Sequence, residues 1–458
     1  MAEPLIISVS GMRGVVGDNL TSSIAADYGS AFGTFLKNTY SGKKGKPSVC
    51  IGTDSRPSGR MLNAAVTTGL TAVGIDVIQL GIVTTPGVGV MVSHLGCGGG
   101  VVVTASHNPI RYNGIKLLME PGIAPAAETA EQIKQYFLNK RFTFVDSTEH
   151  GRVTSDSRTA RIHIGKVLSI VDRKKIAAKK FRVVLDSVNG AGAGVTKKLL
   201  GELGCEVHPM NDEPTGLFPH PPEPTAENLT ALSEAVKNKR ADIGFGQDPD
   251  ADRLAVVDEN AAYIGEEYTL ALAAKYIFSK KCGKAATNLS TSRMIDDIAT
   301  AAGGQVIRTP VGEANVASAM VENNCIIGGE GNGGIIDLRV VAVRDSLVAI
   351  VLVLQLMAET QKSISELVGE IGGYYMTKHK FTADKSQAQQ ILDSAVKLFT
   401  DAKLDTTDGC RFDFNDGWLH LRTSNTEPVM RLVVEANDRQ IAEKYINAVM
   451  NLRKKATG

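Results

Sequence analysis

The segment PSVCIGTDSRPSGRMLNAAVTTGLTAVGIDVIQL, residues 47–80, decides the fold of this chain. It begins with a short apolar run, passes through a polar turn and continues with an amphipathic stretch of helical length. That stretch stops at Gly74, and a second apolar run follows. A glycine that closes a helical stretch is a helix stop signal, and the β-branched run behind it indicates a strand. The segment therefore predicts a strand, a helix and a second strand, the unit from which α/β domains are built.

Two later segments have the same organisation. Residues 181–210 read FRVVLDSVNGAGAGVTKKLLGELGCEVHPM, and residues 286–309 read ATNLSTSRMIDDIATAAGGQVIRT. Their helical stretches end at Gly204 and at Gly303, and each is followed by another short apolar run. A strand, helix and strand unit that recurs along the chain predicts several α/β domains of similar design.

The C-terminal part has a different pattern. Residues 411–436 alternate apolar and polar side chains around Asp416-Gly417, which predicts a β-hairpin, and a helix is expected from residue 438 to about 454. A chain of 458 residues is too long for one core. We expect an α/β protein with three similar α/β domains with mixed sheets and a C-terminal α+β domain. The expected boundaries are 1–150, 151–257, 258–372 and 373–458.

The charges and cysteines restrict the classes of function. Lysine and arginine number 50 against 49 acidic residues, so a net charge of +1 gives no general attraction for nucleic acid or acidic membranes. The first residues, MAEPLIISVSGMRG, lack the pattern of a signal peptide, and the longest apolar stretch, 347–357, is too short to span a bilayer. The six cysteines form no CxxC pair. We therefore expect a cytoplasmic protein without a nucleic-acid or membrane partner.

The turn TASHNP, residues 104–109, follows the apolar run GGGVVV. It places Ser106 and His107 at the end of an expected buried strand. An ordinary polar turn is one explanation, and a serine nucleophile presented at a strand end is the other.

A second polar turn, GQDPDADR, places Asp248, Asp250 and Asp252 at alternate positions. Carboxylates this close repel one another unless a cation neutralises them, and oxygen ligands suit Mg²⁺. A solvated acidic turn is the alternative. An EF-hand is not expected, because its sixth position requires glycine and the chain has Arg253, and because residues 254–257 predict a strand.

Two further turns carry polar groups that suit a sugar phosphate. The glycine-rich segment 328–334 includes Glu330 and Asn332, which suit sugar hydroxyls, although a flexible turn is equally consistent with it. The segment 422–428, RTSNTEP, has an arginine, hydroxyls and an amide that suit a phosphate dianion, although a capped turn is the alternative.

Three smaller features complete the survey. Arg13 lies between glycines and Arg56 lies in a turn after a strand, and a surface charge is the ordinary explanation for such an arginine. The glycines at 190–194 have GxGxG spacing and do not match the dinucleotide fingerprint GxGxxG. The pattern GxxxxGK[ST] does not occur in the sequence, so a P-loop kinase is not expected.

In this order, the four polar turns resemble the α-D-phosphohexomutase family over the whole chain. The resemblance rests on TASHNP at 104–109 with YNGIK at 112–116, DPDADR at 248–253, GEGNG at 329–333 and RTSNTEP at 422–428. It implies four domains around a central cleft. It also implies a mutase that interconverts hexose 6-phosphate and hexose 1-phosphate through a phosphoserine and a hexose 1,6-bisphosphate, with bound Mg²⁺.

The resemblance also implies roles for individual residues. Ser106 carries the phosphoryl group, and Mg²⁺ is held by Asp248, Asp250 and Asp252 together with Ser106. Groups that steady the phosphoryl oxygens or move a proton are Arg13, His107, Lys116 and Arg253. Residues that bind the sugar or its second phosphate are Glu330, Asn332, Arg422, Ser424, Asn425, Thr426 and Arg431.

The chain departs from the usual family pattern at four positions. Asn332 and Gly334 stand where a serine and a histidine are common, and Pro310 and Glu313 lie where the family loop often carries basic residues. The proton donor and acceptor therefore stay open. The GEGNGG loop resembles the archaeal-like branch, so glucosamine phosphate is the first expectation, and mannose or glucose phosphate is the alternative.

Other classes of function also remain. A sugar-phosphate phosphatase would use the same serine and metal but would release inorganic phosphate. A non-catalytic sugar-phosphate sensor is less consistent with an intact serine and three intact aspartates. The expected partner is a small phosphosugar, and the expected state is a monomer or a homodimer.

Overall fold

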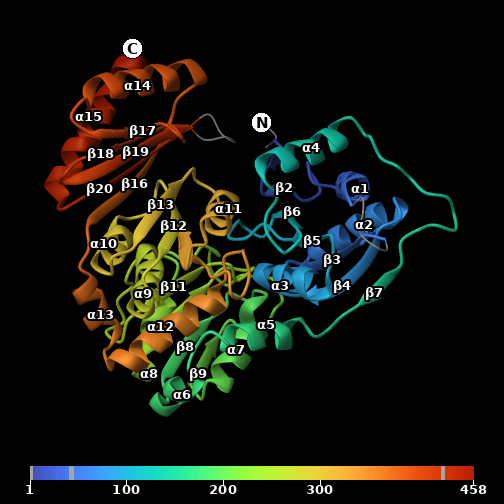
Figure 1. The fold of residues 1–458 in the computed structure, drawn as a ribbon, viewed down its shortest axis with the longest axis horizontal. Coiled ribbons are helices and arrows are strands. Elements are labelled where there is room, and N and C mark those ends of the chain that lie inside the picture. Colours follow the sequence, from blue (N-terminus) through green and yellow to red (C-terminus); the bar gives the residue numbers. More distant parts are fainter. Residues whose placement is uncertain (1–3, 41–45, 424–428, 458) are drawn as a thin grey trace.

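The computed structural model describes residues 4–40, 46–423 and 429–457, and within these ranges the strands form four sheets (Figure 1). Three sheets mix parallel and antiparallel strands, and the fourth is antiparallel, which confirms the expected fold class. We call the four parts that contain these sheets the first, second, third and C-terminal units. Figure 1 shows them in chain order, from the blue first unit to the red C-terminal unit.

The first unit has a seven-stranded sheet of order β1-β2-β6-β5-β3-β4-β7. Its strands are β1 (Ile6–Ser8), β2 (Gly11–Val15), β3 (Ser48–Thr53), β4 (Asp76–Ile82), β5 (Gly99–Val103), β6 (Tyr112–Met119) and β7 (Val153–Ser155). Its helices are α1 (Ser22–Thr39), α2 (Gly59–Ala72), α3 (Thr85–Leu95) and α4 (Ala127–Leu138). Strand β7 comes after residue 150 in the chain and pairs with β4 of the first sheet. The division of the chain at 150, 257 and 372 stays a prediction.

The segment that predicts a strand, helix and strand forms β3, α2 and β4, with β3 and β4 parallel. Helix α2 ends before Gly74, whose φ of +86° suits glycine. Helices α1 and α2 pack so closely that a Cβ at Gly69 would lie 2.0 Å from the carbonyl oxygen of Ala26. A Gly69→Ala change would therefore push the two helices apart.

The second and third units share one topology, with orders β11-β10-β8-β9 and β13-β12-β14-β15. Their strands are β8 (Arg182–Asp186), β9 (Glu206–Met210), β10 (Ile243–Gln247), β11 (Leu254–Val257), β12 (Lys284–Asn288), β13 (Gln305–Thr309), β14 (Ile327–Glu330) and β15 (Gly334–Ile336). Their helices are α5 (Thr159–Leu168), α6 (Arg173–Lys179), α7 (Gly192–Glu202), α8 (Thr230–Lys239), α9 (Glu266–Lys280), α10 (Met294–Ala301), α11 (Glu313–Asn323), α12 (Ser346–Thr360) and α13 (Ile364–Ile371). The β4-β3-β5-β6 part of the first sheet has the same order and directions.

Three of the polar turns occupy the same place in this shared topology. Each lies between the third parallel strand and the antiparallel strand after it, which are β5 and β6, β10 and β11, or β14 and β15. Each turn includes one residue with left-handed backbone, namely Ser106 (φ +49°), Ala251 (φ +54°) or Gly333 (φ +82°). The repeated fold therefore supplies one equivalent turn per unit, and the sequence gives each turn different chemistry.

Helix α12 joins the units through a common apolar core. Its side chains from Leu347 to Met357 are almost entirely buried, and all of them except the polar Gln355 belong to one hydrophobic cluster with residues of all three α/β units. A helix that is apolar on every side requires such complete burial. Within the described ranges no single helix is long and apolar enough to cross a membrane, and only the pair α12 and α13, bent by 90°, passes that test together.

The C-terminal unit is an antiparallel sheet of order β16-β20-β19-β18-β17 with its own hydrophobic core. Its strands are β16 (Tyr375–Thr382), β17 (Lys403–Asp405), β18 (Cys410–Asp413), β19 (Gly417–Thr423) and β20 (Val429–Ala436), and its helices are α14 (Lys385–Leu398) and α15 (Arg439–Thr457). The hairpin expected at Asp416-Gly417 joins β18 to β19, and α15 is the expected last helix. Polar contacts attach this unit to the third unit, including a 2.8 Å hydrogen bond between Ser290 Oγ and His420 Nδ1.

Candidate active site

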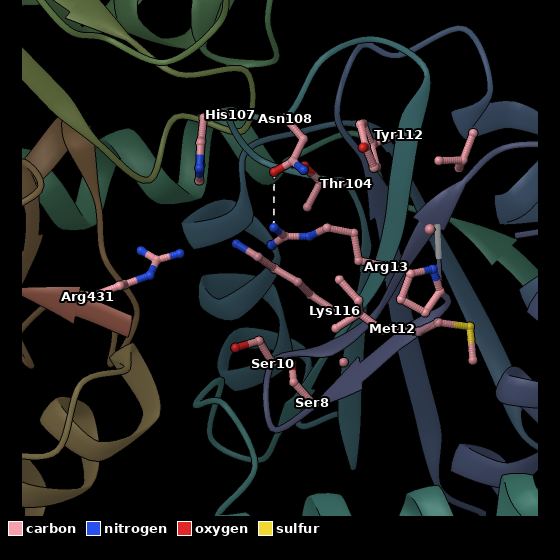
Figure 2. Close-up of a pocket in the computed structure, with 15 residues that line it drawn as sticks. Ser8, Ser10, Met12, Arg13, Thr104, His107, Asn108, Tyr112, Lys116 and Arg431 are labelled. Carbon is pink, nitrogen blue, oxygen red and sulfur yellow. Dashed lines mark hydrogen bonds between the residues drawn. The ribbon is translucent and has the colours of Figure 1, made fainter. Parts of the chain in front are cut away.

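A pocket of about 510 Å³ lies between the first unit and the C-terminal sheet (Figure 2). Arg13 of β2, Lys116 of β6 and Arg431 of β20 direct their cationic ends into the same space, beside His107 and Asn108. The Arg13 side chain is fixed by a 3.0 Å hydrogen bond from Nη1 to Asn108 Oδ1. Cations that converge on one hollow favour a phosphate ligand.

The turn TASHNP is held from beneath by a buried arginine, Arg56, which is only 2% exposed. Its guanidinium donates hydrogen bonds to four backbone carbonyls, those of Ser106, Asn108, Pro109 and Tyr112. Asp54 Oδ2 accepts hydrogen bonds from Arg56 Nε at 3.0 Å and from Thr104 Oγ1 at 2.7 Å. Arg56 is therefore not a surface charge, and its planar set of donors shapes the whole turn.

Ser106 lies at the centre of the site. Its hydroxyl donates a 2.8 Å hydrogen bond to Asp248 Oδ2, and His107 Nδ1 is 3.4 Å from the same oxygen atom, Oγ. The Ser106 backbone N–H donates to Thr104 Oγ1 at 2.9 Å, which supports the left-handed conformation of the serine. The structure thus brings the turn of the first unit against the acidic turn of the second unit.

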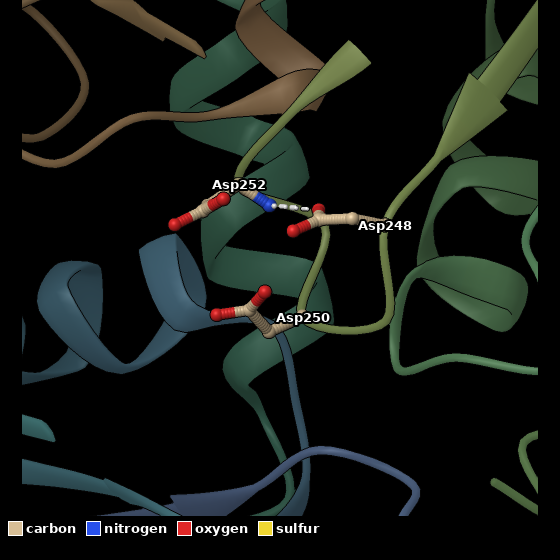
Figure 3. A group of neighbouring side chains, drawn as sticks. All are labelled: Asp248, Asp250 and Asp252. Carbon is tan, nitrogen blue, oxygen red and sulfur yellow. Dashed lines mark hydrogen bonds between the residues drawn. The ribbon is translucent and has the colours of Figure 1, made fainter. Parts of the chain in front are cut away.

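Asp248, Asp250 and Asp252 form a compact and fully buried group (Figure 3). One carboxylate oxygen from each lies within 4.8 Å of the others. Among the described residues, Asp250 Oδ1 and Asp252 Oδ1 are buried without a hydrogen-bond partner. Burial and the two neighbouring carboxylates raise the pKa of Asp248 well above its ordinary value. Clustered oxygen donors with two free oxygens fit a hard divalent cation such as Mg²⁺.

Lys116 approaches this acidic group from the first unit. Its Nζ lies 3.0 Å from Asp250 Oδ2 and 3.1 Å from Asp252 Oδ2. Burial lowers the pKa of the Lys116 ammonium, but the two carboxylates outweigh it and raise that pKa above its ordinary value. Thr85, which the sequence did not single out, donates a 2.6 Å hydrogen bond to Asp250 Oδ2. Lys116 therefore stays charged beside the serine and the acidic cluster.

His107 and Arg253 both approach Glu223, whose Oε1 lies 3.8 Å from His107 Nε2 and 3.8 Å from Arg253 Nη1. Burial, Arg253 and Arg13 lower the pKa of His107 to about 2, so its imidazole is neutral near pH 7. Arg253 Nε lies 3.8 Å from Asp252 Oδ1. The first and second units together surround Ser106 with a neutral base and several cations.

The glycine-rich turn of the third unit presents Glu330 and Asn332 to a second pocket of about 170 Å³. Glu330 Oε1 accepts from Asn288 Nδ2 at 2.8 Å, and Glu330 Oε2 accepts from Arg344 Nη1 at 2.6 Å. Burial disfavours the carboxylate, but Arg344 and Asn288 lower the pKa of Glu330 below its ordinary value. Glu330 is therefore an anionic hydrogen-bond acceptor with a fixed orientation.

The C-terminal unit contributes Arg422 and Arg431 to this second pocket, and Arg431 also lines the first. The two arginines are directly opposite each other on β19 and β20. Like charges at directly opposed positions of two antiparallel strands repel each other and destabilise the sheet. An anion bound between the two arginines would relieve this repulsion. Lys378 lines the same pocket, and it also was not expected from the sequence. Ser424, Asn425 and Thr426 lie outside the described residues.

The unusual segment 308–315 lies next to these residues. Glu313 lines a further pocket of about 630 Å³ together with Pro310 and Asp408. Its Oε1 accepts a 2.8 Å hydrogen bond from the Arg344 backbone N–H. Burial raises the pKa of Glu313, although Arg344 and Lys116 oppose that effect. Arg344, which belongs to none of the expected turns, contacts several of their residues and is the main group that the sequence patterns missed.

Family models match the chain in four consecutive parts. The phosphoglucomutase/phosphomannomutase α/β/α domains I, II and III match residues 5–144, 161–263 and 266–374, and the C-terminal domain of that family matches residues 379–452.

Individual proteins are similar over nearly the whole chain. The phosphoglucomutase/phosphomannomutase of Thermococcus kodakarensis is 38% identical over 451 residues, which cover 97% of this chain and 98% of that protein. A Methanopyrus kandleri protein named probable phosphoglucosamine mutase is 36% identical over 96% of each chain. The crystal structure of a phosphoglucomutase/phosphomannomutase family protein from Burkholderia thailandensis has a TM-score of 0.87 and 26% identity, and the match covers 99% of this chain and 97% of that one.

Proposed function

This chain belongs to the phosphoglucomutase/phosphomannomutase family, the α-D-phosphohexomutases, and from that premise we propose that it interconverts hexose 6-phosphates and hexose 1-phosphates with Ser106 as the phosphoryl carrier. Members of this family are isomerase-class phosphotransferases. The observation that carries the proposal is the position of Ser106, whose hydroxyl is hydrogen-bonded to Asp248 within the buried acidic group.

The groups around Ser106 supply what phosphoryl transfer requires, which is mainly positioning and charge neutralisation. A divalent cation held by Asp248, Asp250 and Asp252 supplies positive charge next to the serine oxygen when it is bound. Lys116 and Arg13, which both line the first pocket, hold the phosphoryl oxygens. These groups together favour the spread of negative charge that develops during transfer.

The proposed reaction has two transfers. Phosphoserine 106 gives its phosphoryl group to the free hydroxyl of a hexose monophosphate, which loses its proton and becomes a hexose 1,6-bisphosphate. The bisphosphate turns over, and its other phosphoryl group returns to Ser106 Oγ while the sugar oxygen regains a proton. His107 and Lys116 are the candidate groups for moving these protons, because both line the first pocket and His107 Nδ1 lies 3.4 Å from Ser106 Oγ.

The second pocket suits the phosphate that does not react. Arg422 and Arg431 line this pocket, with Lys378 and Glu330 beside them. The sugar binds in both orientations during the cycle, so these groups must accept either phosphate. Glu330 then holds a sugar hydroxyl, since its carboxylate is ionised and fixed on two sides.

Glucosamine phosphate is the proposed substrate, and mannose or glucose phosphate is the alternative. Glu313, Glu330 and Glu267 line the pockets around the expected sugar position, and carboxylates suit the ammonium group of an amino sugar. Similarity to proteins named probable phosphoglucosamine mutase supports the same choice, whereas the Thermococcus kodakarensis protein named phosphoglucomutase/phosphomannomutase supports the alternative. The cytoplasmic location and the monomeric or dimeric state stay predictions.

A substrate panel tests this proposal. Purified protein is incubated with Mg²⁺, a trace of glucose 1,6-bisphosphate and the 1-phosphates of glucosamine, mannose and glucose, and the 6-phosphates are measured together with inorganic phosphate. We expect 6-phosphate to form without steady release of inorganic phosphate, and fastest from glucosamine 1-phosphate. Steady release of phosphate would indicate a phosphatase, and binding without turnover would indicate a sensor.

A further inference from the structure

Arg344 links the acidic turn of the second unit to the glycine-rich turn of the third. It lies between β15 and α12 and is 7% exposed. Its Nη2 donates a 2.7 Å hydrogen bond to Asp252 Oδ2, and its Nη1 donates a 2.6 Å hydrogen bond to Glu330 Oε2. One rigid guanidinium therefore fixes the distance between a carboxylate of the metal group and a carboxylate of the sugar pocket.

A third carboxylate completes this arrangement. Glu313 Oε2 is 3.7 Å from Arg344 Nη2, and Glu313 Oε1 accepts from the Arg344 backbone N–H. Asp252 Oδ2 also accepts a 3.1 Å hydrogen bond from Lys116 Nζ. The other carboxylate oxygen, Asp252 Oδ1, has no hydrogen-bond partner among the described residues. Arg344 thus faces two buried carboxylates and the partly buried Glu313, and it occupies one oxygen of Asp252 while the other stays available.

Gly334 provides the space in which the Arg344 side chain lies. A Cβ on Gly334 would be 2.2 Å from Arg344 Cδ and 2.9 Å from Arg344 Cγ. The φ of Gly334 is outside the left-handed region, so backbone conformation does not require glycine here. The observed position of Arg344 therefore requires glycine at 334, the position at which a histidine is common in the family.

We propose that Arg344 is a positioning residue for the mutase reaction, which holds Glu330 at the sugar in a fixed relation to Asp252 at the metal group. The proposal rests on the proposed function and extends it. Arg344 acts through Glu330 and Asp252, because both terminal nitrogens of its guanidinium already donate hydrogen bonds to them. Loss of these two hydrogen bonds should therefore weaken sugar binding through Glu330, beyond any effect on folding.

The test compares Arg344→Met, which keeps much of the side-chain volume, with Arg344→Lys, which keeps the positive charge but loses the planar pair of N–H donors. Gly334→Ala displaces the same side chain without changing it. The matched controls are Arg161→Met, at an exposed arginine of α5, and Gly369→Ala, where a Cβ would meet nothing within 4 Å. Binding of glucosamine 6-phosphate and glucose 6-phosphate is measured by calorimetry, with kcat, KM and thermal unfolding in parallel.

We expect Arg344→Met and Gly334→Ala to weaken sugar-phosphate binding and raise KM by at least about tenfold, while both controls stay near the wild type. Arg344→Lys should recover only part of the loss, since an ammonium group does not bridge two carboxylates in fork geometry. Combining Arg344→Met with Glu330→Gln should weaken binding no more than the worse single change does, because both act on one interaction.

The outcomes separate this inference from the proposed function. Binding that is unchanged in both Arg344→Lys and Gly334→Ala would reject the positioning role, and so would fully additive losses in the double variant. These two variants also keep the test decisive if Arg344→Met does not fold. Wild-type protein that neither binds nor converts a hexose phosphate would reject the proposed function itself.

Discussion

Ser106 Oγ and Asp248 Oδ2 are 2.8 Å apart although the two residues are separated by 142 positions in the chain. The contact joins the polar turn of the first unit to that of the second. It places the candidate phosphoryl carrier directly beside the candidate metal ligands, and several predictions depend on it.

Ser106 should be partly phosphorylated in purified protein, and Ser106→Ala should abolish turnover because the carrier oxygen is lost. Intact mass with peptide mapping locates the phosphate, and Ser93→Ala on the exposed side of α3 is the control. A fully active Ser106→Ala protein, with phosphate on another residue, would refute the mechanism.

Asp250→Asn should lower kcat by roughly 10²–10³-fold, since it removes one anionic ligand of the cation and so weakens the charge that stabilises the transition state. Activity should also disappear with excess chelator and return with Mg²⁺. Asp146→Asn, at an exposed position, serves as control. Turnover that survives both the substitution and the chelator would show that the acidic group does not act through a metal.

Arg422→Ala should raise KM by about ten- to more than a hundredfold, because a charge-assisted phosphate contact is worth about 1.5–3 kcal/mol. The effect on kcat should be small, since the contact is similar in the ground and transition states. Steady-state kinetics with the 1-phosphate and the 6-phosphate measure it, and Arg439→Ala, at an exposed position of α15, is the comparison. An unchanged KM for both substrates would remove Arg422 from the phosphate site.

Arg56→Ala should destabilise the protein by about 3–5 kcal/mol, because it leaves the buried Asp54 carboxylate without its cation. The turn around Ser106 should lose its shape, so activity should fall as well. Chemical denaturation of this variant beside the exposed Arg60→Ala variant measures the difference. Equal stability of the two variants would contradict the role given to Arg56.

His420 should make stability depend on pH. Burial lowers its pKa from 6.5 to about 4, so the neutral form is favoured in the folded state. Its stabilising contribution is complete above pH 6.5 and is lost as the pH falls toward 4, by about 3 kcal/mol at most. Calorimetric unfolding of wild type and His420→Gln between pH 7 and 4 tests this. Parallel pH profiles would show that another group is responsible.

The fold was largely predictable because its signals are local. The helical stretch before Gly74 and the alternation around Asp416-Gly417 specify elements within a few residues of themselves, and the structure has both. The polar turns were recognised for the same reason, since each one is continuous in sequence.

The supporting residues were not predictable in this way. Arg344 is 92 positions from Asp252, and Arg56 is 50 positions from Ser106. Apart from Asp54, which lies two residues before Arg56, nothing next to either arginine in the sequence indicates its partners, because these contacts arise only when units pack together or when distant strands pair. The conformation of the turn at residues 104–109 therefore depends on contacts that no periodic pattern encodes.

The equivalent turns of the three α/β units have an evolutionary consequence. Duplication of one ancestral unit would provide three copies of the same strand-to-strand connection, each already directed toward a shared interior. One copy was then free to acquire a serine, another the aspartates and a third the glycine-rich loop, without changes to the sheets beneath them. Substrate choice in such an enzyme can diverge through the third copy alone, while the chemistry of the other two is preserved.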